Sequence, residues 1–340
     1  MTKQLFLTQG AKERNMVYSP LSIHIVPSLI AAGTKGHTEK ELLSFLKSKS
    51  TADSTPLPLI SSLWSLMTDL PEAGLVCPLE VDVQTNAEEV RIKVNLWAKK
   101  ETRGLITEVL LFGSVNNITR LNFGNALYFK GVWDDQFNAS KTKKYDLYCL
   151  NGKPSVKAPF MTNYHHQYVK AFDGFKVLKL LHQKGETEKW CFSMCLFLPD
   201  EKDGLPALVK RVCTEPGFLD HHLPNTRVRV GDFRIPKFKI TSSFEASEVL
   251  KELGLVLPFE VDPYNGGNLT EMVDSPPDEV PFVSSIFHKS FIEVNENGKE
   301  AAAVTFSSKV VGSCRPCHRP KPIDFVVDHP FLFFYQKGND

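Results

Sequence analysis

The sequence predicts an α+β protein in which several β-sheets are surrounded by helices. Strand-like runs of apolar and β-branched residues recur along the chain, and segments with helical periodicity separate them. This interspersed order favours sheets and helices that pack together. The length of 340 residues allows one large domain or two ordinary ones. Because the elements alternate throughout, we expect a single domain over residues 1–340.

Helices are predicted first, in the N-terminal region. Ser19 is a capping residue and Pro20 suits the first helical position, and apolar residues follow at helical spacing. Thr38 is expected to cap a second helix over residues 39–47. An amphipathic pattern over residues 86–100 predicts a further helix.

Strands are predicted mainly in the rest of the chain. The segment from residue 75 to residue 83 is expected to begin as a loop and become a strand. The strongest strand signal lies at 119–129, which is rich in aliphatic and aromatic residues. The continuous apolar run 192–200 is typical of a strand buried on both faces.

The segment after residue 290 combines a strand, a turn and a run of alanines. Residues 291–294 are apolar and β-branched, and Asn295-Glu-Asn-Gly298 interrupts them as a turn does. Ala301-Ala-Ala303 suits a helix fragment or a thin tether, and as a strand its small side chains would pass between neighbours with little clash. A segment that fits both a loop and a strand is a candidate switch.

These motifs resemble those of the serpins, most closely the plant type. Gly298-Lys-Glu-Ala-Ala-Ala resembles the family hinge, and Ile323-Asp-Phe-Val-Val-Asp-His-Pro-Phe resembles the strand that returns from the reactive-centre loop. Asn125-Ala-Leu-Tyr-Phe-Lys-Gly-Val-Trp133 matches the family at almost every position. The resemblance covers nearly the whole chain and implies a serpin fold with an exposed reactive-centre loop over residues 298–322.

The resemblance implies an inhibitor of serine or cysteine endopeptidases and not an enzyme. In the family a protease attacks the loop and forms an acyl-enzyme, and the loop then inserts into the main sheet and traps the protease. The sequence has no Gly-x-Ser-x-Gly, no His-Glu-x-x-His and no phosphate loop. The alternative is a non-inhibitory protein of the same fold, which a protease merely cleaves.

The resemblance also assigns three groups of residues to the insertion mechanism. A polar shutter lies beneath the sheet, a breach lies where the loop enters, and a hinge precedes the loop. A buried polar cluster needs its hydrogen bonds satisfied, so the shutter is expected to act as a latch. The shutter residues are Ser19, Ser22, Asn125 and His288; the breach residues are Trp133, Lys237 and Glu296; the hinge residues are Glu296, Gly298, Lys299, Glu300, Ala301, Ala302 and Ala303.

The scissile bond follows from the nearly fixed distance between hinge glycine and cleavage site in relatives. Counted from Gly298, this distance places the bond at Gly312-Ser313 and implies a protease that tolerates small residues. The alternative bond is Cys314-Arg315, which would bring a basic residue closer to the cleavage site. Cleavage after Arg315 itself would suit a trypsin-like protease, but Pro316 follows and usually blocks it.

No cofactor or metal is expected. Cys314-Arg-Pro-Cys317-His318 formally matches the haem-attachment pattern, but it falls in the predicted loop without a surrounding pocket signal. A labile disulfide or a modified thiol is more plausible there than haem attachment. The paired histidines 165–166 and 221–222 have spacings that fit no common metal site, and we expect them at the surface.

Charge and cysteine content limit the partners. With 40 Lys and Arg against 39 Asp and Glu, the chain has almost no net charge. We therefore expect no electrostatic attraction to nucleic acid or to an anionic membrane surface. No apolar run is long enough to span a bilayer. Seven scattered cysteines and the absence of signal-peptide features favour the cytoplasm or nucleus, although family analogy also allows the extracellular space. We expect a monomer whose partner is a protease.

Three blocks of the family pattern are missing from this chain. Most of the first helix is absent before Asn15, a strand and a helix are absent between Leu75 and Glu80, and a buried strand is absent after the segment that begins at Phe331. Missing strands are expected to leave unpaired sheet edges and to strain the fold.

A fourth departure lies in the hinge, where Lys299 replaces the usual Thr or Ser. Residues of a strand alternate between its faces, so Lys299 shares the buried face of an inserted loop with Ala301 and Ala303. Burying an ammonium group without a partner costs several kcal/mol or forces its deprotonation. Slow insertion would give the protease time to deacylate, which turns an inhibitor into a substrate.

Overall fold

The computed structural model describes residues 15–48, 73–76, 87–116, 119, 121–129, 131–164, 166–183, 191–260, 269, 281–297 and 321–338. The chain divides into two compact units. The first contains residues 1–130 and 239–293, and the second contains residues 131–238 and 294–340. The single domain expected from the sequence stays a prediction.

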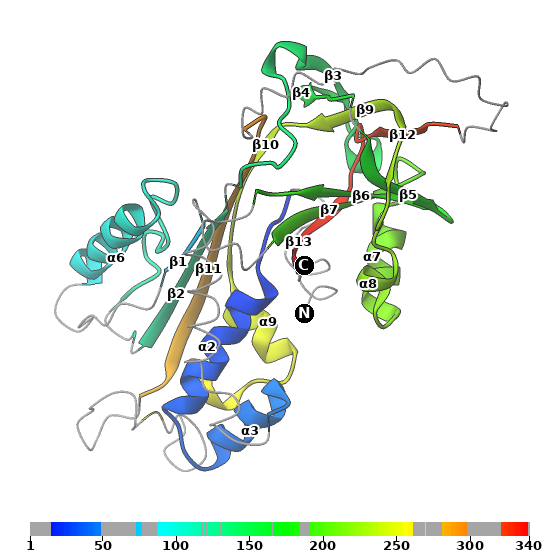
Figure 1. The fold of residues 1–340 in the computed structure, drawn as a ribbon. Helices are drawn as coiled ribbons and strands as arrows, with labels where there is room; N and C mark the ends of the chain where they lie inside the picture. Colours follow the sequence, from blue (N-terminus) through cyan, green and yellow to red (C-terminus); the bar gives the residue numbers. More distant parts are fainter. Residues whose placement is uncertain are drawn as a thin grey trace, which may run out of the picture. The chain divides into compact units, whose positions relative to one another are not determined.

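The first unit is built on a four-stranded sheet of order β1-β2-β11-β10 (Figure 1). β1 is antiparallel to β2, whereas β11 pairs with β2 in parallel. Its elements are α2 (Pro20–Ala32), α3 (His37–Leu46), β1 (Ala73–Val76), α6 (Ala87–Glu101), β2 (Leu121–Phe129), β10 (Phe238–Glu245), α9 (Ala246–Glu252), η3 (Leu257–Phe259) and β11 (Val283–Val294).

Helices cover both faces of this sheet, because β2 and β11 carry apolar side chains on both. On one face Ile30 of α2 packs with Phe123 and Ile286 in the main core. On the other face Ala98 of α6 packs with Ala126 and with residues of the loop after α6. Figure 1 shows α2 and α6 on opposite sides of β2 and β11. The two central strands are therefore buried from both sides.

The second unit contains two sheets. One has the order β12-β9-β4-β3, and the other has the order β13-β7-β6-β5-β8. Phe175, Phe197 and Phe218 form the core between the larger sheet and helices α7 and α8. The elements are η1 (Ala139–Lys141), β3 (Lys143–Leu147), η2 (Leu150–Gly152), β4 (Val156–Met161), β5 (Gln167–Phe172), β6 (Phe175–Leu181), β7 (Cys191–Pro199), α7 (Leu205–Thr214), α8 (Phe218–His221), β8 (Arg227–Val228), β9 (Val230–Pro236), β12 (Ile323–Val326) and β13 (Leu332–Gly338).

Two local predictions were wrong. Thr38 does not cap its helix: α3 begins earlier, at His37 after Gly36, and the Thr38 hydroxyl is buried without a hydrogen-bond partner among the described residues. The chain around Leu75 is not a loop, because β1 includes it and pairs with β2. A short strand thus borders β2 where the sequence predicted that a strand of the main sheet was missing. The hydrogen bonds to β2 determine that these four residues form a strand, because so short a segment has only a weak strand propensity of its own.

The described helices are all too short or too polar to cross a bilayer.

Candidate functional site

The shutter residues lie on the face of the first unit's sheet that α2 covers. Asn125 of β2 and His288 of β11 are direct neighbours in the parallel register. Both side chains are buried, with exposures of 4% and 0%. The structure therefore places two polar groups side by side in the core, at the contact between the two central strands.

Ser22 connects the start of α2 to β2. Its hydroxyl donates to Asn125 Oδ1 at 2.6 Å, and Asn125 Nδ2 donates to the Ser22 carbonyl oxygen at 2.6 Å. Ser19 contributes indirectly, by holding Ser22. It is the N-cap residue of α2, and its hydroxyl accepts a hydrogen bond from the Ser22 amide at 3.1 Å. Ser19 thus orients the helix start, and Ser22 contacts the strand.

His288 does not join this hydrogen-bond network, which corrects the prediction that all four shutter residues are bonded together. Neither ring nitrogen has a hydrogen-bond partner within the described part of the chain. The imidazole packs against Phe244 instead, with ring centroids 5.2 Å apart. Because burial disfavours the charged form, the pKa of His288 falls to about 3, so the ring is neutral at ordinary pH.

Sequence reasoning missed a further polar contact at this place. Ser290 lies on the same face of β11 as His288, and its hydroxyl donates to the Val17 carbonyl oxygen at 2.6 Å. The chain leading into α2 is therefore bonded to β11 through Ser290, and α2 itself is bonded to β2 through Asn125. The only signal in the sequence was the period-two spacing from His288.

The breach residues meet in the second unit, where the chain leaves β11. Trp133 holds the backbone on both sides of Glu296: its indole nitrogen donates to the Asn295 oxygen at 2.7 Å, and its amide donates to the Asn297 oxygen at 3.0 Å. The indole is 2% exposed and stacks on His182, with ring centroids 4.3 Å apart. We call Trp133 and the backbone of residues 295–297 the clamp.

Glu296 forms an ion pair in the same place. Lys237 Nζ lies 2.6 Å from Glu296 Oε2, and the Thr142 hydroxyl donates to Oε1 at 2.7 Å. Partial burial by itself raises the pKa of the Glu296 carboxyl, but the hydrogen bonds from Lys237 and Thr142 outweigh it and hold the pKa below its usual value. The sequence predicted the Lys237 pair and missed Thr142.

The remaining predicted site residues lie outside the described residues. These are the hinge from Gly298 through Lys299 and Glu300 to Ala303, the proposed bond Gly312-Ser313, and the cysteine motif at 314–318. Among the described residues, no group of three or more His, Cys, Asp or Glu side chains has the arrangement of a metal site.

A family described as "Serpin (serine protease inhibitor)" matches residues 76–340. The chain therefore belongs to the serpin family, as the resemblance predicted.

Its relatives include plant proteins over nearly their full length. The chain is 44% identical to Serpin-ZXA from Oryza sativa subsp. japonica, over 96% of this chain and 88% of that protein. It is 43% identical to Serpin-ZX from Arabidopsis thaliana, over 96% of this chain and 89% of that protein. Among solved structures, Arabidopsis AtSerpin1 in its native stressed conformation matches with a TM-score of 0.85 at 40% identity, over 99% of this chain and 91% of that one. Uncleaved ovalbumin, at 20% identity and a TM-score of 0.73, shares the fold.

Proposed function

We propose that this chain inhibits endopeptidases: a protease attacks the loop after β11, and the cleaved loop enters the sheet of the first unit and traps the acyl-enzyme. The observation that carries the proposal is the direct parallel pairing of β2 with β11. A strand that leaves the end of β11 and turns back would run antiparallel to both neighbours. It would replace one parallel ladder by two antiparallel ladders, which are the slightly more stable kind.

The magnitudes favour insertion once the loop is cut. β2 offers nine residues to a new neighbour. One additional ladder of that length adds on the order of 10 hydrogen bonds at about 1 kcal/mol net each. The start of α2 is bonded to β2 through Ser22–Asn125, and the chain just before it is bonded to β11 through Ser290. Parting the strands therefore breaks one of these links, which costs up to about 2–4 kcal/mol by the same scale. The shutter therefore delays insertion without preventing it.

Lys299 acts on the rate of insertion and not on its end point. Its cost of several kcal/mol is smaller than the gain of the complete ladder, but it arises at the first residues to enter. Insertion competes with hydrolysis of the acyl-enzyme, so a slow first step increases the share of protease that escapes. This chain is therefore proposed as an inhibitor with a high proportion of substrate turnover.

The test is incubation with an elastase-like serine protease, a trypsin-like serine protease and a papain-like cysteine protease. We expect a complex that survives SDS with the elastase-like enzyme, and mass spectrometry should place the cut at Gly312-Ser313. An Ala301→Pro variant is the matched control, because proline cannot join the new ladder and the band should disappear while cleavage continues. Cleavage without any covalent band in the parent chain would support the alternative, a non-inhibitory protein that proteases cleave.

We also propose that the inhibitor acts as a monomer with a single protease bound. Size-exclusion chromatography with light scattering should give the mass of one chain before mixing and of a one-to-one complex afterwards. Residence in the cytoplasm or nucleus stays a prediction.

A further inference from the structure

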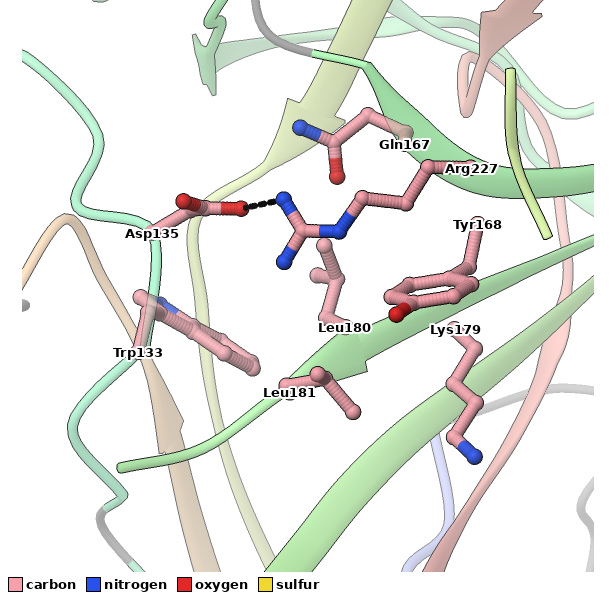
Figure 2. Close-up of a pocket in the computed structure, with 8 residues that line it drawn as sticks. All are labelled: Trp133, Asp135, Gln167, Tyr168, Lys179, Leu180, Leu181 and Arg227. Carbon is pink, nitrogen blue, oxygen red and sulfur yellow. Dashed lines mark hydrogen bonds and ion pairs between the residues drawn. The ribbon is translucent and has the colours of Figure 1, made fainter. Parts of the chain in front are cut away.

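A small open hollow lies beside the clamp in the second unit. Trp133 and Asp135 line it on one side, and Tyr168 and Arg227 line it on the other. Figure 2 shows the Arg227 guanidinium reaching across this hollow to Asp135, with the Tyr168 ring alongside. The mechanism described above uses Trp133 but gives no role to Arg227.

Arg227 contacts both sides of the hollow. Its Nη1 donates to Asp135 Oδ2 at 2.7 Å, and its Nη2 lies 3.9 Å from Asp134 Oδ2. The guanidinium also lies over the Tyr168 ring, 5.0 Å from the centroid. Tyr168 is its direct neighbour in the β5–β8 register, so the arginine extends from a strand of the large sheet. A planar cation stacked on an aromatic ring keeps one orientation at little entropic cost.

The aspartates belong to the segment that carries Trp133. On its inner side this segment is bonded to the end of β6: the Asp134 amide donates to the Leu181 oxygen at 2.9 Å, and the Gln183 amide donates to the Val132 oxygen at 2.9 Å. At the next residue, Asp135, the segment is held by a side-chain ion pair with Arg227. Backbone hydrogen bonds at Val132 and Asp134 thus flank Trp133, and the ion pair of Asp135 with Arg227 is the next contact along the chain.

We propose that Arg227 is a positioning residue that controls how readily Trp133 releases the backbone of Asn295 and Asn297. Loss of the guanidinium removes its contacts with Asp134 and Asp135, lets the Trp133 segment shift and weakens the clamp. A weaker clamp lets the hinge leave sooner after the loop is cut, so insertion begins earlier. This inference rests on the proposed function for its effect on inhibition, whereas the effect on the clamp is independent of it.

Hydrogen exchange of the Trp133 amide is the direct test, since this amide donates to Asn297. We expect Arg227→Ala to speed its exchange about threefold to tenfold, which is the range for a partly exposed ion pair with a stacked ring. Arg227→Lys should restore part of the protection. Asp135→Asn should speed exchange less than Arg227→Ala, because the contacts of Arg227 with Asp134 and Tyr168 remain. The double variant should be no faster than Arg227→Ala, since the contact with Asp135 is already lost in that single variant.

Arg211→Ala is the matched control. Arg211 is in the same unit, also lies over aromatic rings and also pairs with a carboxylate, Glu215. Among the described residues, its contacts are with Asp173, Phe175, Glu215 and Phe218, and not with the Trp133 segment. It should leave the Trp133 amide unchanged. Equal exchange in Arg227→Ala and the parent chain, or equal acceleration in Arg211→Ala, overturns the inference.

Protease partitioning provides the second measurement. Arg227→Ala should raise the ratio of trapped to cleaved protease about twofold or more, and Arg211→Ala should not change it. If the parent chain traps no protease, the proposed function fails, and the exchange rates alone decide on Arg227. If exchange rises while the partition ratio stays the same or falls, the clamp does not limit insertion and the inference is overturned.

Discussion

Replacement of Asn125 by alanine tests the shutter as a latch. The substitution removes two buried hydrogen bonds of 2.6 Å, one donated by the Ser22 hydroxyl and one donated to the Ser22 carbonyl. Each is worth about 1 kcal/mol net, and the Ser22 hydroxyl left unpaired in the core costs a further 1–2 kcal/mol or so. We expect the free energy of unfolding to fall by about 3 kcal/mol.

The assay is urea unfolding followed both by tryptophan fluorescence and by circular dichroism, because the chain has two compact units and the two probes need not coincide. Asn138→Ala is the control: Asn138 is exposed and only caps a short 3-10 turn. It should cost under about 1 kcal/mol.

A double-mutant cycle with Ser22→Ala decides whether the two groups act together. We expect a coupling energy of about 1–2 kcal/mol, since the second substitution removes a group that is already unpaired. Additive losses would refute the reasoning, because they would mean that the Ser22–Asn125 contact contributes nothing of its own. A loss below about 0.5 kcal/mol for Asn125→Ala alone would do so as well.

Three other predictions concern neighbouring residues. The folded pKa of His288 lies near 3, below the unfolded value of 6.5, so the unfolded chain binds this proton first and stability falls as pH drops from about 6.5 to 3. His288→Leu should remove up to roughly 5 kcal/mol of that fall in acid titrations of unfolding. Ser290→Ala leaves the partly buried Val17 carbonyl without this donor and should lower the free energy of unfolding by about 1–2 kcal/mol in the same urea assay, a change absent if water replaces the hydroxyl. Lys299→Thr should raise the ratio of trapped to cleaved protease, and an unchanged ratio would mean that another step limits insertion.

Local signals in the sequence determined a large part of this protein. Ser19 and Pro20 predicted the start of α2, because a hydroxyl acceptor and a fixed backbone angle act within one turn. The apolar run 192–200 predicted β7, because a strand buried on both faces needs apolar side chains at every position. The Lys237–Glu296 pair came from the family pattern and is formed at 2.6 Å.

Tertiary structure alone decided the contacts between distant segments. The Ser290 hydroxyl bonds a carbonyl 273 positions away, Thr142 bonds Glu296 across 154 positions, and Arg227 meets Asp135 across 92. None of these residue types predicts its partner, because serine, threonine and arginine occur at many exposed positions where water satisfies them. The same limit explains His288: the family resemblance implied that it shares a hydrogen-bond network with Asn125, but in the structure its ring packs against Phe244. Hydrogen bonds within one turn depend on neighbouring residues, whereas those across the core depend on which strands the whole chain brings together.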